Sequence, residues 1–296
     1  MDAAVILGVS EPIDLSYVGR MDLLVLGGSG FLGREIIRQA LLGRHHVTAT
    51  FHTRALPSAG VDWRPLDLRH RADVTALVAW LRPDVIINVA YRQGDWATTA
   101  DGAIHVALAV ASIASRLVHV SSDAVFAGTK PSYDETDLPD PTTPYGAAKA
   151  AAETAVKAIT PTAVIARTSL IIGDGDSPQE QQVHALASGG RAGTLFTDDV
   201  RCPVHVTDLA AALLQLAASA HFGVHHVAGA DAVSRYELGI LIARRDGLDA
   251  TKITAGLRAE SGIPGPIDVR LDCTRTQARL ATRLRGAREF LRPDQR

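Results

Sequence analysis

Residues 23–33 read LLVLGGSGFLG, an apolar run of four residues that ends in a cluster of glycines. An amphipathic run follows and stops at Gly43, so the order is strand, glycine turn, helix. In such a turn Gly27 permits the tight bend, and Gly30 lets the backbone approach a pyrophosphate. Gly33 lets the helix and the strand pack closely. The stretch therefore predicts a dinucleotide phosphate held at the start of the first helix.

Strand and helix patterns alternate after this turn. Such alternation is typical of a parallel sheet with right-handed crossovers, so the predicted fold class is α/β, a Rossmann-type doubly wound sheet with a small C-terminal α/β lobe. We expect an extension at 1–20, the sheet domain at 21–170, and at 171–296 mainly a substrate lobe, some segments of which can return to the sheet. The expected strands are 46–51, 61–68, 84–90, 118–120, 162–172 and 224–228, and the expected helices are 72–81, 103–114 and 145–159.

Two further helices are expected near the C-terminus. An Ala/Leu-rich run follows Thr207 and Asp208, one of which should be its N-cap, and Ser234 should cap the next helix.

Tyr145 and Lys149 lie four residues apart in an Ala-rich run that begins after Pro144. Proline is tolerated at a helix start, and side chains four apart share one helix face. A nearby ammonium favours the phenolate and lowers the pKa of a tyrosine from about 10, toward the range useful for general acid catalysis. Taken alone, such a pair is more often an ordinary surface pair. Beside the glycine turn, it indicates protonation of a carbonyl oxygen as hydride reaches the carbon.

Three motifs together resemble the extended short-chain dehydrogenases/reductases, and within them the dTDP-4-dehydrorhamnose reductase branch. They are the glycines of residues 27–33, the segment Ser-Ser-Asp-Ala-Val-Phe at 121–126, and Tyr145-x-x-x-Lys149. The resemblance runs from Met21 to about Leu291. It implies NADPH-dependent reduction of a ketone, most closely the 4-keto group of a nucleotide-activated deoxysugar. Tyr145 would donate the proton, Lys149 would also hold the nicotinamide ribose, and Ser122 would polarise the carbonyl.

The residues after the second strand bear on the cofactor. The strand ends in His52, Thr53 and Arg54, whereas an NAD enzyme usually places an acidic residue here for the ribose 2′-OH. Arg54 could pair with a 2′-phosphate, so NADP(H) is preferred and NAD(H) is the alternative; Arg54 could equally be a solvated loop residue. By resemblance, Asp67 and Leu68 lie against the adenine, and Asn88 and Ala90 lie beside the cofactor. The candidate cofactor ligands are Gly27, Ser29, Gly30, Phe31, Leu32, Gly33, His52, Thr53, Arg54, Asp67, Leu68, Asn88, Ala90, Tyr145 and Lys149.

Polar residues at strand exits are candidate substrate ligands, because ligands bind at the carboxyl ends of parallel strands. In the family, the turn at Arg201 faces the nucleotide-sugar, so this arginine is a candidate diphosphate ligand. The candidates are Tyr91, Arg92, Ser122, Asp123, Ser169 and Arg201.

The chain also departs from the family's patterns. The related dehydratases follow their catalytic Thr with Asp-Glu, whereas Asp123 is followed by Ala124, which argues against dehydration. The rhamnose-pathway reductases usually carry aromatic residues where this chain has Ala124 and Leu170. The substrate expected here is therefore not fixed as dTDP-4-dehydrorhamnose.

Two other functions stay open. One is a reductase of another ketone, or an epimerase, although epimerases hold NAD tightly and the missing acidic residue weighs against that. The other is a non-catalytic NADP-binding subunit, because the regulatory subunit of methionine adenosyltransferase is a relative of this family. The intact Ser122, Tyr145 and Lys149 favour catalysis.

Composition excludes several classes of protein. The 296 residues, 47% of them hydrophobic, can bury a large core, and a net charge of −2 gives no case for nucleic acid. No apolar run approaches the roughly 20 residues that span a bilayer. The two cysteines form no disulfide framework, and no Cys/His cluster has zinc spacing. We expect a cytoplasmic monomer or homodimer that binds a small molecule and no metal.

Overall fold

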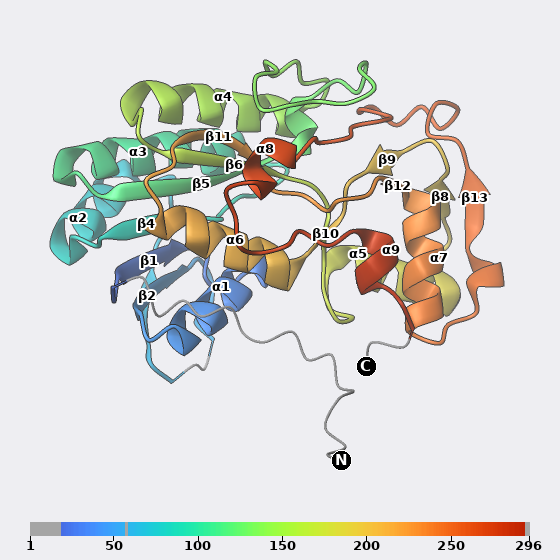
Figure 1. The fold of residues 1–296 in the computed structure, drawn as a ribbon, viewed down its shortest axis with the longest axis horizontal. Coiled ribbons are helices and arrows are strands. Elements are labelled where there is room, and N and C mark those ends of the chain that lie inside the picture. Colours follow the sequence, from blue (N-terminus) through green and yellow to red (C-terminus); the bar gives the residue numbers. More distant parts are fainter. Residues whose placement is uncertain (1–18, 57–58, 294–296) are drawn as a thin grey trace, which may run out of the picture.

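The computed structural model describes residues 19–56 and 59–293, so nearly all of the extension predicted at 1–20 lies outside the described residues. A seven-stranded sheet forms the centre of the molecule, in the order β11-β6-β5-β4-β1-β2-β3 with every pair parallel (Figure 1). The order reverses between β1 and β4, which confirms the doubly wound sheet. Its strands are β1 (Asp22–Leu26), β2 (His46–Phe51), β3 (Val61–Pro65), β4 (Val85–Asn88), β5 (Arg116–Ser122), β6 (Val164–Thr168) and β11 (Gly223–His226).

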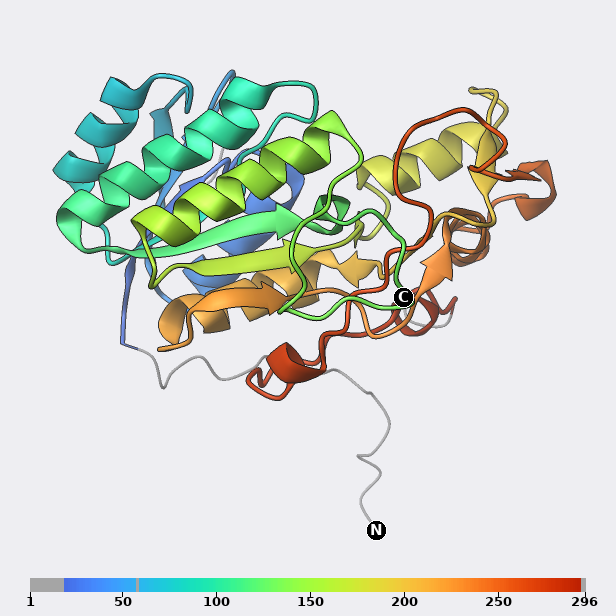
Figure 2. The ribbon, with the colours of Figure 1, turned by 90° about the horizontal axis from the view of Figure 1, so that it is seen from above.

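Helices cover both faces of the sheet, and Figure 2 shows the two layers. Because both faces are buried, the strands read as nearly continuous apolar runs. A π-helical turn (Ala97–Asp101) leads into one of the helices. One face carries α2 (Arg71–Leu81), α3 (Gly102–Ile113) and α4 (Pro144–Ile159), and the other carries α1 (Phe31–Leu42) and α6 (Val206–Ala218).

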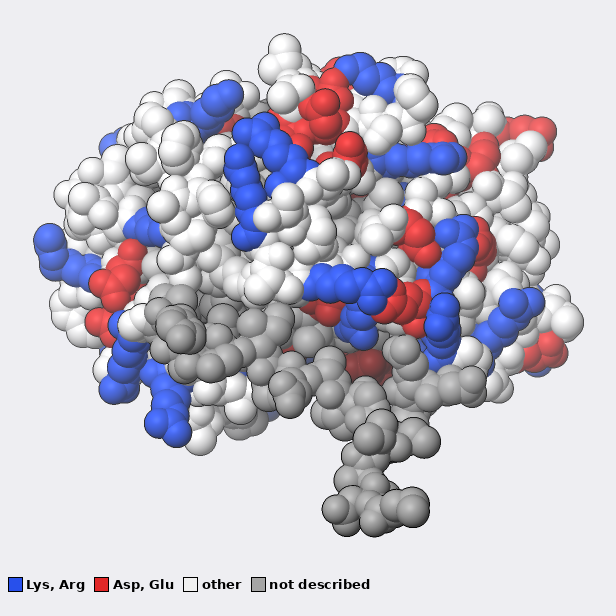
Figure 3. Space-filling view, viewed as in Figure 1, with Lys and Arg blue, Asp and Glu red and all other residues white. Residues whose placement is uncertain are grey.

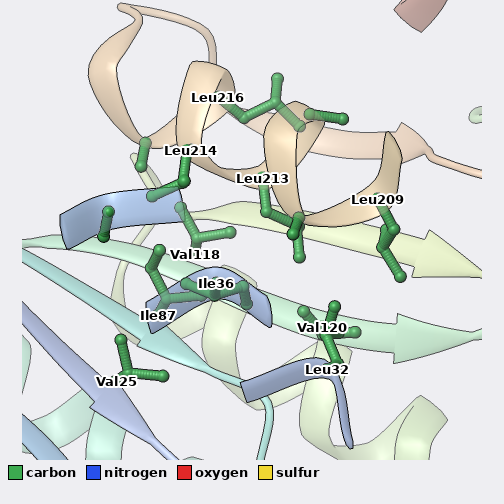
Figure 4. Close-up of a cluster of buried hydrophobic side chains, with 14 of the residues drawn as sticks. Val25, Leu32, Ile36, Ile87, Val118, Val120, Leu209, Leu213, Leu214 and Leu216 are labelled. Carbon is green, nitrogen blue, oxygen red and sulfur yellow. The ribbon is translucent and has the colours of Figure 1, made fainter. Parts of the chain in front are cut away.

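The core between α6 and the sheet joins distant parts of the chain (Figure 4). Leu209 and Leu213 of α6 are fully buried, and they belong to one apolar cluster with Val25 of β1, Ile87 of β4 and Val118 of β5. Burying each such side chain contributes about 1.5–3 kcal/mol. Together with β11, this helix shows that part of the C-terminal half returns to the sheet; the division at residue 170 itself stays a prediction.

Most of the remaining elements form a lobe beside the carboxyl ends of the strands, whereas α8 (Thr274–Gln277) packs against β11 of the main sheet (Figure 1). The lobe's apolar cluster includes Val183, Leu195, Leu238 and Ile242. The lobe and its connections contain β7 (Ile171–Ile172), α5 (Pro178–Ala187), β8 (Thr194–Phe196), β9 (Val200–Arg201), β10 (Val204–His205), β12 (Val233–Ser234), α7 (Arg235–Arg245), β13 (Thr254–Gly256) and α9 (Ala287–Phe290), with 3-10 turns at Asp123–Val125 and Ala250–Lys252. These strands form three two-stranded sheets, in which β7 pairs with β10, β9 with β12, and β8 with β13.

Two predicted boundaries were wrong. The strand expected over 162–172 breaks after Thr168, and β7 pairs with β10 outside the main sheet. Helix α6 begins two to three residues earlier than predicted, because its N-cap is His205, not Thr207 or Asp208; the His205 side chain accepts from the Thr207 N–H at 3.3 Å. Asp208 instead binds Arg285 at 2.8 Å, a contact that sequence does not reveal. The cap at Ser234 is confirmed by its 3.0 Å hydrogen bond from the Glu237 N–H.

Three buried histidines predict a pH dependence of stability. Burial lowers the pKa of His119 to about 3, and the pKa values of His225 and His226 to about 4, from 6.5. Nearby cations add to this lowering: Lys149 for the first, Arg279 for the second and Arg167 for the third, partly opposed by Glu135 at the last two. The unfolded chain therefore binds more protons than the folded chain between about pH 6.5 and pH 4.

The stability that these neutral histidines contribute is fully present above pH 6.5. The free energy of unfolding should therefore fall steadily as the pH drops from 6.5 toward 4. The urea midpoint, measured from pH 8 to pH 5, checks this, because most carboxylates in the unfolded chain still carry their charge at pH 5. His226→Leu should reduce the dependence of the urea midpoint on pH. A midpoint that is flat between pH 7 and pH 5 would contradict this assignment.

Candidate functional site

The glycine turn after β1 has the geometry that a bound phosphate needs. Gly27 has φ +83°, and a Cβ there would lie 2.9 Å from the Ala90 backbone. A Cβ on Gly33 would lie 2.4 Å from the Gly27 carbonyl oxygen. Helix α1 starts after Gly30 without a side-chain cap, which leaves the N–H groups of its first turn open to an anion. Ser29, Phe31 and Leu32 lie in the same turn and helix start.

The exit of β4 lies against this turn. Asn88 is buried, and its Oδ1 accepts from the Ala90 N–H at 3.1 Å, so it shapes the backbone beside Gly27. The next residues, Tyr91 and Arg92, are exposed and begin the loop predicted to face ligands.

Basic side chains gather at the exits of β2 and β3. Arg69 binds both oxygens of Asp67, at 2.9 and 2.6 Å, and holds the pKa of that carboxyl well below its ordinary value. His52 lies 3.5 Å from the same carboxylate and also contacts Thr53. Arg54 is exposed and forms no hydrogen bond or ion pair among the described residues. Sequence reasoning missed Arg69, which an Asp-x-Arg pair at a strand exit could have indicated.

Leu68, which was predicted to lie against the adenine, follows Asp67 at the exit of β3. Its side chain is buried, and its carbonyl accepts from His105 at 2.8 Å. Of the basic residues His52, Arg54 and Arg69 at the exits of β2 and β3, Arg54 is the one that lies near no carboxylate among the described residues.

Strand β5 and helix α4 bring the predicted triad together. Thr143 caps α4 by accepting from the Gly146 N–H at 3.1 Å, and Pro144 occupies the first turn. A Cβ on Gly146 would lie 2.0 Å from the Ala124 carbonyl oxygen, so only glycine lets α4 approach the turn after β5 this closely. This approach places the Tyr145 phenol beside the Ser122 side chain, close enough for Ser122 to influence the pKa of the phenol.

Lys149 lies one turn further along α4 and is fully buried. Its Nζ donates to the Val120 carbonyl at 2.9 Å and lies 5.2 Å from the centre of the Tyr91 ring. Burial lowers the pKa of Lys149 to about 8. The Tyr91 ring also lies 5.7 Å from the Tyr145 ring, so one aromatic residue covers both α4 side chains.

The expected lowering of the Tyr145 pKa by Lys149 is not found in this structure. Burial, with smaller effects of Tyr91 and Asp123, raises the pKa of Tyr145 above its ordinary value, and Ser122 opposes the rise only in part. The phenol is therefore protonated at neutral pH, which is the state that a proton donor requires.

The substrate candidates at the exits of β5 and β6 also meet. Asp123 accepts from the Ser169 hydroxyl at 2.7 Å and from the Ser122 hydroxyl at 3.2 Å. The Nε of Arg201 lies 3.7 Å from the same carboxylate, but its Nη atoms donate to three backbone carbonyls. Those carbonyls belong to Val200, Pro266 and Ile267.

A buried ion pair lies behind the triad. Arg167 binds both oxygens of Glu153, at 3.1 and 2.8 Å, and the Ser121 hydroxyl donates to the same carboxylate at 2.5 Å. Glu153 lies one turn beyond Lys149, so this pair fixes α4 against β5 and β6. Sequence reasoning missed it, although an acidic residue on the Tyr145–Lys149 face was a visible signal.

This geometry suits the protonation of a carbonyl oxygen. A serine hydroxyl and a protonated phenol converge from β5 and α4, beside a buried ammonium and the uncapped glycine turn. Among the described residues there is no group of three or more His, Cys, Asp or Glu side chains placed to hold a metal ion. In the same part of the chain, no helix has the length and apolar character needed to cross a membrane. Figure 3 shows basic and acidic side chains interspersed over one face of the molecule.

Comparison with known proteins places this geometry in context. The family model described as the RmlD substrate binding domain matches residues 21–293. A probable low-salt glycan biosynthesis reductase of Haloferax volcanii is 30% identical over 260 residues, 82% of this chain and 86% of that protein. The methionine adenosyltransferase 2 subunit beta of Xenopus laevis is 28% identical over 274 residues, 86% of this chain and 81% of that protein.

Solved structures agree with the sequence relatives. The crystal structure of a hypothetical dTDP-4-dehydrorhamnose reductase from Sulfolobus tokodaii has a TM-score of 0.78 to this chain at 30% identity. The match covers 90% of this chain and 97% of that structure, so the similarity includes both the sheet and the lobe.

Proposed function

The chain belongs to the RmlD substrate binding domain family and is an NAD(P)-dependent oxidoreductase, and from this premise we propose that it reduces the 4-keto group of a nucleotide-activated deoxysugar with NADPH. The observation that carries the proposal is the meeting of Ser122, Tyr145 and Lys149 beside the open glycine turn. A carbonyl oxygen held there faces two hydroxyl donors.

The residues of the chain perform the proton chemistry. The Ser122 hydroxyl and the Tyr145 phenol hold the substrate's carbonyl oxygen, and the phenolic proton passes to this oxygen as the carbon is reduced. The nicotinamide, when bound, supplies the hydride. The Lys149 ammonium, one helical turn from Tyr145, holds the nicotinamide ribose. The Ser122 hydroxyl, which donates to Asp123 at 3.2 Å, turns its single proton from Asp123 to the carbonyl oxygen when the substrate binds.

The proposed substrate class, a 4-keto nucleotide sugar, is argued from the names of the relatives and from two positions at which this chain differs from the rhamnose-pathway reductases. Relatives that match most of the chain are named as reductases of glycan and deoxysugar synthesis. Ala124 and Leu170 stand where an aromatic residue is expected in the reductases of rhamnose synthesis, and Leu170 packs against the lobe's apolar cluster. We therefore propose a related 4-keto sugar as the substrate, rather than dTDP-4-dehydrorhamnose itself.

NADP(H) is the proposed preferred cofactor, with NAD(H) as the alternative. If Arg54 binds the 2′-phosphate, Arg54→Ala should weaken NADPH binding about 10- to 100-fold and leave NADH binding nearly unchanged. This loss of affinity is that expected when one hydrogen bond between charged groups is removed. Titration of both cofactors into the purified variants measures this. The exposed Arg191 of the lobe provides a matched control, since Arg191→Ala should change neither affinity. Equal losses for NADPH and NADH in Arg54→Ala would refute the role.

One observation favours a second function. The similarity to a beta subunit of methionine adenosyltransferase 2 spans 86% of this chain. A non-catalytic NADP-binding subunit would bind NADPH and show no turnover with any 4-keto nucleotide sugar. The complete triad favours the catalytic function.

A further inference from the structure

The ring of Tyr91 covers the two α4 side chains that the proposed chemistry needs. Its centre lies 5.2 Å from the Lys149 Nζ and 5.7 Å from the centre of the Tyr145 ring, to which it is tilted by 47°. Lys149 is only 2% exposed, whereas Tyr91 is 56% exposed. The Tyr91 ring therefore lies on the solvent side of the buried ammonium.

The Lys149 ammonium has two donors without an acceptor in the chain. An ammonium carries three N–H donors. One of them reaches the Val120 carbonyl at 2.9 Å, and the other two make no hydrogen bond within residues 19–56 and 59–293. The Tyr91 ring partly compensates for them, because the negative face of an aromatic ring attracts a cation. Since the rest of Lys149 is buried, a ribose hydroxyl reaches these donors only after the ring has moved.

The course of a bound dinucleotide also passes Tyr91. A Cβ on Gly27 would lie 2.9 Å from the backbone of Ala90, so Tyr91 directly follows the residue that touches the glycine turn. A cofactor with its pyrophosphate at this turn and its nicotinamide ribose at Lys149 must run between the two places. The ring of Tyr91 lies on that course.

The backbone on both sides of Tyr91 is held in place, but its side chain is not. The Asn88 Oδ1 accepts from the Ala90 N–H at 3.1 Å. The Thr99 hydroxyl accepts from the Arg92 N–H at 3.1 Å and donates to the Arg92 carbonyl at 2.8 Å. The Tyr91 hydroxyl forms no hydrogen bond in the part of the chain that the structure describes. Rotation of the exposed side chain therefore moves the ring without rearranging the loop.

We propose that Tyr91 is a side-chain gate for the nicotinamide half of the cofactor, closed over Lys149 and Tyr145 in this structure and opened when the ribose takes the place of the ring at Lys149. This inference rests on the role proposed for Lys149 and not on the identity of the sugar. The same movement uncovers the ammonium and the phenol, so cofactor binding prepares the site at which the ketone is reduced. Tyr91 thereby sets the cofactor affinity, because only the open fraction of the protein binds the nicotinamide half.

Removal of the ring should tighten cofactor binding. In Tyr91→Ala the closed state loses its contact with the ammonium, so the Kd for NADP⁺ should fall about 5- to 30-fold, the effect of one cation–π contact on a two-state equilibrium. Tyr91→Phe keeps the ring and should bind NADP⁺ as the parent does. Isothermal titration of the purified full chain measures these affinities.

Two controls show whether the effect belongs to the gate. Trp96 lies in the same loop, is 50% exposed, and has no ring contact with Lys149 or Tyr145 among the described residues, so Trp96→Ala should leave the Kd for NADP⁺ unchanged. Adenosine 2′,5′-bisphosphate lacks the nicotinamide half of the cofactor. Its Kd should be the same in the parent and in Tyr91→Ala, and an equal gain for this fragment and for NADP⁺ would overturn the gate.

The remaining outcomes separate the gate from the proposed function, because none of these titrations requires turnover. Tighter NADP⁺ binding in Tyr91→Ala, in a protein that oxidises no NADPH with 4-keto nucleotide sugars, would support the gate and refute the reductase. Turnover in the parent, with a Kd in Tyr91→Ala that is unchanged or higher, would support the reductase and overturn the gate. Thermal unfolding reports whether each variant is folded. If Tyr91→Ala does not fold, a crystal structure of the parent with NADP⁺ decides, and a ring that still covers Lys149 in that complex would overturn the gate.

Discussion

Tyr145→Phe should lower kcat for ketone reduction by about 10²–10⁴-fold and leave NADPH affinity unchanged. The phenol is the protonated group that contacts Ser122, and the substitution removes only its hydroxyl. Without the phenolic proton, only the hydrogen bond from Ser122 would remain to stabilise the negative charge that develops on the oxygen as hydride arrives at the carbon. Steady-state NADPH oxidation gives kcat, and a fluorescence titration gives the cofactor affinity.

Tyr91→Phe is the matched control, because Tyr91 carries a second phenol whose ring lies 5.7 Å from that of Tyr145. This variant keeps the ring that covers Lys149, so it should retain most of the activity. Activity that persists in Tyr145→Phe and disappears in Tyr91→Phe would show that the proton comes from Tyr91.

Arg167→Met should lower the free energy of unfolding by about 3–5 kcal/mol, the cost of leaving a buried carboxylate unpaired. The side chains of Arg167 and Glu153 are 3% and 5% exposed, so water cannot replace the lost partner. The remaining donor to Glu153 is the Ser121 hydroxyl, and a single neutral hydrogen bond does not balance a buried charge. Urea unfolding, monitored by circular dichroism, measures the loss.

A double-mutant cycle distinguishes the ion pair from ordinary packing. Removing both charges, in Glu153→Gln with Arg167→Met, should cost less than Arg167→Met alone, because no unpaired charge remains. If the two single losses simply add in the double variant, the pair does not act as a unit.

The features that sequence predicted are local ones. The glycine turn and the Tyr145–Lys149 helix depend on residues a few positions apart, and the structure places both as expected. The cap of α6 was wrongly predicted, because Thr207 and Asp208 are good N-cap residues by type and the tertiary contact to Arg285 decides otherwise.

The contacts that sequence could not predict join distant segments. Arg235 and Arg258 meet Asp199 only because β12 pairs with β9 and the segment around Pro266 folds back onto the lobe. The raised pKa of Tyr145 likewise comes mainly from burial and in smaller part from Tyr91, which lies at the exit of another strand. Spacing along the chain indicates which residues share a helix face, but not which side chains from other elements lie against them.

The reductase proposal is tested most directly by following the transferred hydrogen. NADPH that carries deuterium at the reactive C4 position is mixed with the protein and a panel of 4-keto nucleotide sugars, and the products are examined by mass spectrometry and NMR. The proposal predicts one deuterium per NADPH oxidised, located on C4 of one sugar in the panel. NADPH binding without oxidation, and no deuterium in any of these sugars, would contradict it and favour the non-catalytic NADP-binding subunit.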